Sequence, residues 1–368
     1  MWPVGIREAW LGRGRRGARR GAGIIAALLA VALLWLATTG DVRVWPVRNT
    51  LQYKLFTFWW TITGTAVDWD PNAIIDRGKR TGTLQPNAAE PALAAGVGLT
   101  LGDPEVVTSQ TPLPGRAVRR SVSFQSGGRS NQLTLLYTPE WVPLGAVLPV
   151  LLTVYPGPAD GWEAASVPLA EAGYAVIAVG PAYSFALERD IDELARLLRF
   201  AREGRLPGAD GSRLAVLGGS YSGLHVLRLL QREHGQMDLR AVVLMGAPTD
   251  LFDMRRRLED RSFVPPFGLD QALIALGIPN RNPARYWRYS GAYHVRPKAP
   301  PHLLIHSRSD DVVPYQQSEL LARSLAGAGV PHELHLMDGG SHYLLSNETE
   351  ARLVQELTLE FLRRYLAG

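Results

Sequence analysis

Residues 213–223 read RLAVLGGSYSG, and residues 224–230 continue as LHVLRLL. The apolar run that opens this stretch predicts a buried β-strand, whereas the apolar residues after it recur at helical spacing. A strand that passes directly into a helix through Gly-Gly-Ser-Tyr-Ser-Gly is typical of a nucleophile elbow, where a strained turn exposes a serine hydroxyl at the edge of a sheet. Ser220 is therefore the candidate nucleophile.

Small residues flank this serine, as an elbow requires, because the strand and helix backbones approach each other closely there. Ser222 takes the place of the second glycine of the G-x-S-x-G pattern and adds one hydroxymethyl group. A short match of this kind also occurs in ordinary glycine-rich turns. The interpretation therefore depends on the rest of the chain.

From Arg116 onward, short β-rich runs alternate with helical ones. This pattern predicts an α/β-hydrolase fold, a mostly parallel sheet with helices on both faces. The first two strands are expected to form an antiparallel hairpin that turns at Gly127 and Gly128. The predicted strands are Ser121–Phe124, Gln132–Tyr137, Val150–Tyr155, Ala175–Val179, Arg213–Leu217, Ala241–Met245, His302–His306 and Glu333–Met337. The predicted helices lie near residues 161–172, 187–203, 221–234, 315–328 and 348–366.

A catalytic carboxylate is expected on a turn after one of the later strands of such a sheet. Asp310 follows the strand that ends at His306, and Asp250 follows the strand that ends at Met245. We prefer Asp310, because a helix begins a few residues later and leaves this carboxylate on a short loop at the carboxyl end of its strand. Asp311 is interpreted as a solvated neighbour or a helix-start residue.

His342 lies in the loop MDGGSHYLL, where two glycines allow the chain to turn back toward the other candidates. The chain order Ser220, Asp310, His342 is that of an α/β-hydrolase triad. The residue types suit the chemistry, because serine needs a base that accepts its proton near neutral pH, and that histidine needs a carboxylate to fix its tautomer. The remaining histidines have ordinary structural interpretations: His225, His234, His294, His302, His306, His332 and His335.

Residues 117–367 resemble the catalytic domain of the prolyl oligopeptidase family of serine peptidases, and within it that of dipeptidyl peptidases. The segments that carry the resemblance are LLTVYPGP (151–158), GGSYSG (218–223), HSRSDDVVPYQQS (306–318) and GGSHYL (339–344). The resemblance implies that Ser220, Asp310 and His342 form the catalytic triad. The chain departs from the family at two positions where the family usually has glycine. These positions are Ser307 and, in the elbow, Ser222.

An acyl-transfer site needs hydrogen-bond donors aimed at the developing oxyanion. The backbone N–H of Tyr221, directly after the nucleophile, supplies one by its position. Pro156 and Pro158 have no N–H, so Gly157 is the nearby glycine donor and the phenol of Tyr155 is the better candidate for the second donor. The family resemblance implies the same role for the Tyr155 hydroxyl.

The resemblance implies a serine hydrolase that cleaves peptide bonds through an acyl-enzyme. Family peptidases usually carry a β-propeller that selects peptides, and residues 39–115 are too few to form one. A carboxylesterase acting on small acyl esters is therefore the alternative, and a catalytically inactive binding module on the same fold is a third. No cofactor and no metal are expected. The expected partners are a peptide or ester substrate and the membrane, and the sequence leaves the oligomeric state open.

The chain contains no cysteine, which excludes disulfides, thiolate metal sites and cysteine nucleophiles. Its formal net charge of +5 arises in residues 1–20, which hold six arginines and one glutamate. The rest of the chain is balanced in charge, which argues against a nucleic-acid-binding surface.

After these arginines, residues 22–37 form an unbroken apolar run, AGIIAALLAVALLWLA. At about 1.5 Å per residue, a helix of this length extends ~24 Å, close to the hydrocarbon thickness of a membrane. We expect a basic cytoplasmic tail over residues 1–21, an uncleaved single-pass anchor over residues 22–38 and an exported catalytic part, because arginines stay on the cytoplasmic side. A cleaved signal peptide and a secreted protein are the alternative.

Residues 39–115 are expected to be an extracytoplasmic extension and linker, because residues 70–115 are rich in Pro, Gly, Ala, Asn and Thr. Residues 55–67 (LFTFWWTITGTAV) are rich in aromatics but too short to span a membrane. They are interpreted either as a buried strand or as a segment at the membrane surface. The catalytic domain is expected to cover residues 116–368.

Overall fold

The computed structural model describes residues 69–85, 97–110, 113–126, 128–142, 145–180, 187–233, 238–260, 262–263, 273, 276, 279–344 and 347–367. The chain from Trp69 to Gly368 forms one compact unit. The predicted cytoplasmic tail, membrane anchor and aromatic-rich stretch lie outside the described residues and stay predictions. Within the described ranges, no helix is both long enough and apolar enough to cross a membrane.

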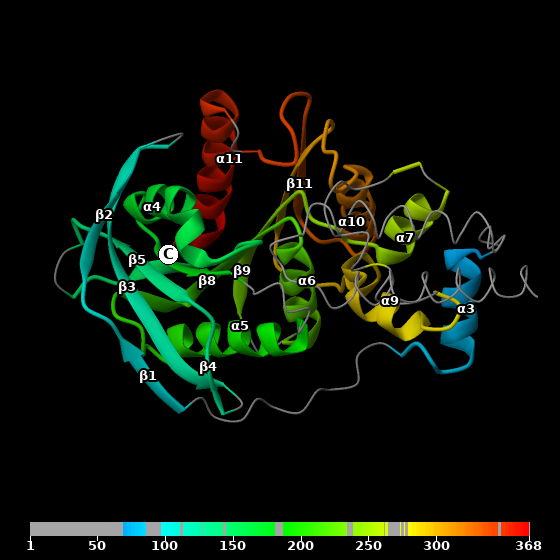
Figure 1. Ribbon diagram of the computed structural model, residues 1–368, viewed down its shortest axis with the longest axis horizontal. Coiled ribbons are helices and arrows are strands. Elements are labelled where there is room, and N and C mark those ends of the chain that lie inside the picture. Colours follow the sequence, from blue (N-terminus) through cyan, green and yellow to red (C-terminus); the bar gives the residue numbers. More distant parts are fainter. Residues whose placement is uncertain are drawn as a thin grey trace, which may run out of the picture. The chain divides into compact units, whose positions relative to one another are not determined.

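A mixed β-sheet forms the centre of this unit (Figure 1). Its strand order is β1-β3-β5-β7-β6-β8-β9-β10-β11, and β2 and β4 pair with β3. Neighbouring strands from β7 to β11 are parallel, whereas β3 and β5 are antiparallel to their neighbours. The α/β-hydrolase fold that the sequence predicts is therefore confirmed. The strands are β1 (Val97–Leu101), β2 (Glu105–Ser109), β3 (Gly115–Ser126), β4 (Arg129–Ser130), β5 (Thr134–Pro139), β6 (Leu148–Val154), β7 (Ala175–Val179), β8 (Ala209–Gly219), β9 (Leu239–Met245), β10 (His302–Ser307) and β11 (His332–Met337).

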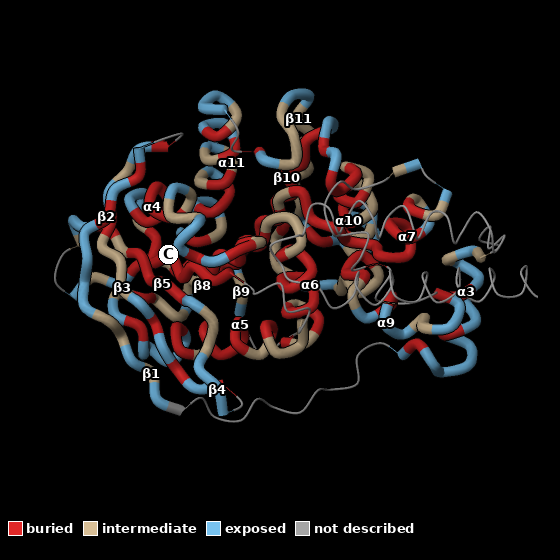
Figure 2. The backbone as a smooth tube through the Cα atoms, viewed as in Figure 1, coloured by how far each residue is buried: buried red, intermediate tan, exposed pale blue. Residues whose placement is uncertain are grey.

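Helices cover both faces of the sheet (Figure 1). Apolar side chains of α4 and α11 pack on one face, and those of α5, α6 and α10 pack on the other. Residues of the central strands alternate between these two clusters, because successive side chains of a strand point to opposite faces. β7 is buried along its whole length, and so is β10 (Figure 2). The helices are α3 (Pro71–Arg80), η2 (Ala159–Trp162), α4 (Glu163–Glu171), α5 (Leu187–Arg202), α6 (Ser222–Arg232), α7 (Leu251–Glu259), α9 (Pro283–Tyr289), η3 (Gly291–His294), α10 (Gln316–Gly327) and α11 (Glu348–Leu366).

A third apolar cluster forms from α3, α7 and α9. Ile75 of α3, Phe252 of α7 and Tyr286 of α9 are buried in it. In addition, β1 and β2 extend the sheet by pairing with β3. The expectation that residues 70–115 form a linker is therefore wrong, because this segment contributes a helix to a core and two strands to the sheet.

The local sequence explains why α3 forms despite the turn-rich composition around it. Asp70 accepts hydrogen bonds from the N–H groups of Asn72 and Ala73, and Pro71 occupies the first turn, where its missing N–H costs nothing. Ile74 and Ile75 then supply the buried face. The proline and polar residues of this segment thus begin a short helix.

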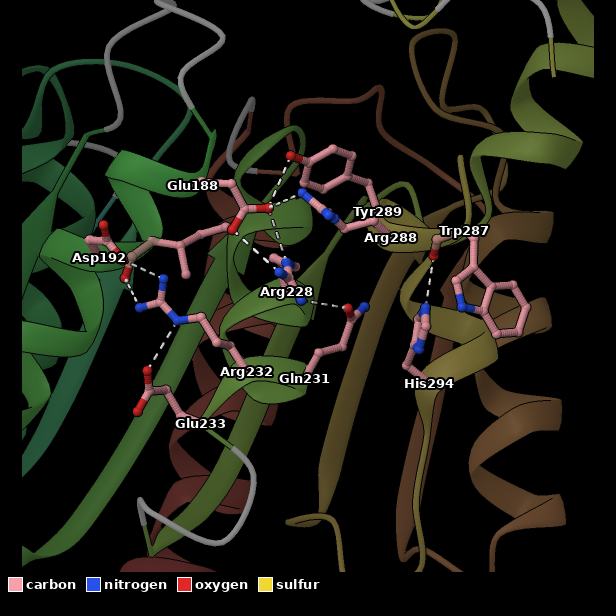
Figure 3. A network of polar contacts seen from close by, with 11 residues as sticks. Glu188, Asp192, Arg228, Gln231, Arg232, Glu233, Trp287, Arg288, Tyr289 and His294 are labelled. Carbon is pink, nitrogen blue, oxygen red and sulfur yellow. Dashed lines mark hydrogen bonds and ion pairs between the residues drawn. The ribbon is translucent and has the colours of Figure 1, made fainter. Parts of the chain in front are cut away.

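Helix α6, which follows the elbow, is held by a network of charged side chains (Figure 3). The Nε–H of Arg228 donates to Glu188 of α5 at 3.1 Å, and the hydroxyl of Tyr289 donates to the same carboxylate at 3.0 Å. Arg232, one turn further along α6, pairs with Asp192 of α5 at 2.5 Å. These contacts tie α6 to α5 and α9, so the helix behind the elbow has a fixed direction.

We predict that Ile75→Ala lowers the free energy of unfolding by about 2 to 4 kcal/mol, because the substitution leaves a cavity in the third cluster. Asp76→Ala is the matched control on the same helix, since Asp76 is exposed and its change should stay within about 0.5 kcal/mol. Urea unfolding of both variants makes the comparison. Equal and negligible effects would mean that residues 71–80 do not belong to the folded unit.

Candidate active site

The elbow has the strained geometry that the sequence predicts. β8 ends at Gly219 and α6 begins at Ser222, and Ser220 between them has a φ of 52°, a left-handed conformation that is costly for a residue with a Cβ. Two hydrogen bonds hold it there, one from the Ser220 N–H to the Met245 carbonyl at 2.8 Å and one from the Gly223 N–H to the Ser220 carbonyl at 2.9 Å. The backbone on both sides of the serine is thus fixed.

Gly223 shows why small residues are needed beside the serine. A Cβ added to Gly223 would lie 2.3 Å from the Cβ of Ala247, which follows β9. No flexible side chain could move away to make room there. The first turn of α6 can therefore approach the neighbouring strand only because this position is glycine.

Ser220, His342 and Asp310 form a chain of hydrogen bonds. The His342 Nε2 atom lies 2.6 Å from the Ser220 Oγ atom, and the Nδ1 atom lies 2.8 Å from the Asp310 Oδ2 atom. The three residues follow β8, β10 and β11, whose carboxyl ends meet at one edge of the sheet. Since a carboxylate can only accept, the Nδ1–H donates to Asp310, and Nε2 is left to accept the serine proton.

The Asp310 carboxylate accepts hydrogen bonds on both oxygens. The N–H groups of Val312 and Val313 donate to Oδ1, each at 2.8 Å, and His342 and His306 lie within reach of Oδ2. Burial disfavours the charged carboxylate, but the hydrogen bonds from His306 and His342 outweigh it and hold the pKa of Asp310 below its ordinary value. Asp310 is therefore ionised at neutral pH.

His306 contacts Asp310, although its position in a predicted strand indicates only an ordinary structural histidine. The side chain is fully buried, and its Nε2 atom lies 2.9 Å from the Val313 carbonyl and 3.1 Å from Asp310 Oδ2. Its Nδ1 atom lies 2.7 Å from the Ser318 hydroxyl. Because both neighbours of Nε2 are acceptors, the proton sits on Nε2, which donates to the Val313 carbonyl and lies beside the carboxylate. The spacing of four residues to Asp310 was the available sequence signal.

The alternative carboxylate, Asp250, has a different role. Its side chain caps α7 by accepting the N–H groups of Phe252 and Asp253, and the Tyr293 hydroxyl donates to it at 2.6 Å. Burial raises the pKa of Asp250 to about 6. No hydrogen bond joins Asp250 to His342 among the described contacts. The preference for Asp310 over Asp250 thus agrees with the geometry.

The two oxyanion candidates offer different donors, a backbone N–H from Tyr221 and a side-chain hydroxyl from Tyr155. Tyr221 is the residue between Ser220 and α6, so its N–H follows the nucleophile as predicted. The buried hydroxyl of Tyr155 lies 3.0 Å from the Ser166 Oγ atom, and burial raises the pKa of this phenol, which keeps its proton. The hydroxyl of Tyr155 is thus directed at α4 in this structure, and its role at the oxyanion stays a prediction.

The part of the chain that the structure describes contains no group of three or more histidine, aspartate or glutamate side chains arranged to hold a metal ion. The side chains joined by hydrogen bonds at the site are those of Ser220, His342 and Asp310. They can transfer a proton from a hydroxyl to an imidazole and stabilise the imidazolium that forms.

Residues 188–368 match the sequence profile of the prolyl oligopeptidase family. Among curated proteins, none matches the chain. This segment contains Ser220, Asp310 and His342, so the family match covers the whole hydrogen-bonded chain of the site.

Among solved structures, the chain is similar to an acylaminoacyl peptidase from Pyrococcus horikoshii, with a TM-score of 0.55 and 19% identity over 75% of this chain and 51% of that one. It is also similar to an esterase from the Planctomycetes species Thermogutta terrifontis, with a TM-score of 0.50 and 18% identity over 72% of this chain and 96% of that one. The chain thus spans about half the length of the acylaminoacyl peptidase. At these identities, the likeness shows a shared fold.

We predict that Gly223→Ala disrupts the elbow, because the added methyl group clashes with Ala247. The melting temperature should fall, and labelling of Ser220 by a fluorophosphonate probe should slow by about tenfold or more, as expected for a misplaced reacting group. The double variant Gly223→Ala/Ala247→Gly removes the opposing Cβ. It should recover most of the lost melting temperature and most of the lost labelling rate. Absence of recovery would mean that the close approach of these two positions is not what positions the serine.

Proposed function

We propose that this chain, whose residues 188–368 belong to the prolyl oligopeptidase family of α/β-hydrolases, is a serine hydrolase that cleaves peptide bonds through an acyl-enzyme at Ser220. The observation that carries the proposal is the hydrogen-bonded chain from the Ser220 hydroxyl through His342 to Asp310, with lengths of 2.6 and 2.8 Å. Family membership supports the hydrolase class, and the geometry supports the assignment of roles.

In the first half-reaction, the Ser220 Oγ atom forms a bond to the carbonyl carbon of the substrate while its proton passes to Nε2 of His342. The tetrahedral intermediate collapses when the carbon–nitrogen bond breaks, and the imidazolium returns that proton to the leaving amine. Asp310 stays ionised throughout and stabilises the imidazolium. The product of this half-reaction is an ester of Ser220.

In the second half-reaction, His342 accepts a proton from water, and the hydroxide oxygen forms a bond to the acyl carbon. The carbon–Oγ bond then breaks, and Ser220 recovers its proton from His342, which releases the acid. The N–H of Tyr221 follows the nucleophile and is placed by chain position to donate to the oxyanion in both halves. No reactant other than substrate and water is required.

A carboxylesterase is the second candidate, because the same two half-reactions cleave an ester when the leaving group is an alcohol. The observation that favours it is the surroundings of the serine, since the described residues that line the cavity beside Ser220 and His342 include no Asp, Glu, Lys or Arg. A carboxylate that could hold the free amine of a peptide is thus missing from that lining.

We predict that Ser220→Ala, His342→Ala and Asp310→Asn each lower kcat by a factor on the order of 10³ or more, because the three groups act as a unit. Asp250→Asn is the matched control, since it changes another buried carboxylate and should leave kcat within about threefold of wild type. Hydrolysis of peptide and p-nitrophenyl ester substrates gives kcat. Loss of activity in Asp250→Asn but not in Asp310→Asn would assign the role of the catalytic carboxylate to Asp250. A wild-type chain that is not labelled by a fluorophosphonate probe would instead be an inactive binding module.

We predict that Tyr155→Phe lowers kcat by roughly 10² to 10³ with little change in KM, because an oxyanion donor acts mainly in the transition state. Ser166→Ala separates this role from a structural one, since it removes the hydroxyl that Tyr155 contacts in the free protein and should leave kcat near wild type. A Tyr155→Phe variant with wild-type kcat would assign the second donor to the N–H of Gly157.

A further inference from the structure

A cavity opens beside the nucleophile, between α4 and α11 on one face of the sheet. Its volume is about 120 Å³. Ser220, His342 and residues of both helices line it. The lining residues used below are Tyr155, Trp162, Ala165, Leu169, Val354 and Thr358.

The lining of this cavity is uncharged and mostly apolar. Two of its polar groups are already engaged, since the Thr358 hydroxyl donates to the Val354 carbonyl at 2.7 Å and the Tyr155 hydroxyl contacts Ser166 at 3.0 Å. An ammonium or carboxylate group placed here would lose its hydration without gaining an opposite charge. The lining therefore excludes an ionised group and favours a hydrocarbon one.

Two aromatic side chains line the cavity. The rings of Tyr155 and Trp162 stack with their centroids 5.0 Å apart and their planes within 1° of parallel. The size of the cavity also limits the group it can hold, because an apolar protein cavity of about 150 Å³ accommodates one benzene molecule. A group of about four to six carbons is therefore the size that fits.

We propose that this cavity binds an uncharged hydrocarbon group of the substrate, about the size of a butyl to hexyl chain or a phenyl ring, next to the bond that Ser220 attacks. The inference rests on the proposed function, since it takes Ser220 as the nucleophile, and it adds the chemical class of the group beside the reacting carbonyl. That group belongs to the acyl part or to the leaving group, and two series of esters distinguish the two.

The test uses adjacent alanines on α4. Ala165 lines the cavity, whereas Ala164 is exposed, so Ala165→Leu fills the cavity and Ala164→Leu adds the same atoms outside it. One series is p-nitrophenyl acetate, butyrate and hexanoate, and the other is ethyl, butyl and hexyl acetate. Values of kcat/KM are measured for wild type and both variants, with Ser220→Ala as the blank.

We expect wild type to prefer the longer member of one series over the shortest by about tenfold or more, because each buried methylene contributes a factor of about four. Ala165→Leu should reduce that preference about tenfold and leave the shortest ester unaffected, whereas Ala164→Leu should behave as wild type. The series that changes identifies the side of the substrate that enters the cavity. Leu169→Ala enlarges the cavity and should shift the preference toward longer chains, which keeps the proposal testable should Ala165→Leu fold poorly.

Fluorophosphonate labelling separates failure of this inference from failure of the proposed function. Variants that label at the wild-type rate but show unchanged chain-length preference in both series would overturn the hydrocarbon site alone. A wild-type protein that is neither labelled nor active on any ester or peptide would overturn the proposed function itself.

Discussion

The left-handed backbone of Ser220 is the constraint on which the rest of the site depends. A residue with a Cβ pays about 1 to 3 kcal/mol for such a conformation, so it persists only where its surroundings enforce it. The hydrogen bond from its N–H to Met245 and the close contact of Gly223 with Ala247 enforce it locally. At longer range, the ion pairs of Arg228 and Arg232 hold α6 against α5 (Figure 3). Because the N–H of Ser220 is used in this way, the next N–H that can face an oxyanion is that of Tyr221.

The remaining two groups reach the serine because parallel strands end at the same edge of a sheet. Asp310 and His342 follow neighbouring strands, β10 and β11, and Gly246 directly follows β9, the strand between β8 and β10. A Cβ at Gly246 would lie 3.3 Å from Asp310 Oδ2 and 3.5 Å from the His342 ring, so the absence of a side chain leaves room for the pair. Asp310 is in turn fixed by donors from its own loop and from His306, which lets the carboxylate orient His342 without moving.

The sequence predicts those parts of the fold whose cause is local. β7 and α11 have the predicted bounds, because an apolar run and an amphipathic stretch identify them without reference to the rest of the chain. Four elements depend on tertiary contacts and escaped prediction. The strands β1 and β2 are short and are stabilised by pairing with β3. The helices α7 and α9 are short and need the third cluster.

The candidate site likewise contains residues that the local sequence identifies and contacts that depend on tertiary packing. Chain order and glycine context suffice to select Ser220, Asp310 and His342, which the structure brings together. The contact of His306 with Asp310 requires knowing which way a buried strand side chain points. The placement of the Tyr155 hydroxyl against Ser166 depends on how α4 packs over β6, which no motif encodes.

The fold itself does not decide between a peptide and an ester, since similar structures include an acylaminoacyl peptidase and an esterase, and the attack on a carbonyl carbon is the same for both. The decision therefore falls to what lies beside the serine. Trp162 and Ala165 line the cavity. The same segment contacts Tyr155 twice, because the Trp162 ring stacks on the Tyr155 ring and the Ser166 hydroxyl is hydrogen-bonded to the Tyr155 hydroxyl. A group that fills the cavity would contact the ring of Trp162, which is stacked on the ring of Tyr155. The short stretch of chain from Trp162 to Ser166, at the end of η2 and the start of α4, thus connects the lining of the cavity to the oxyanion candidate.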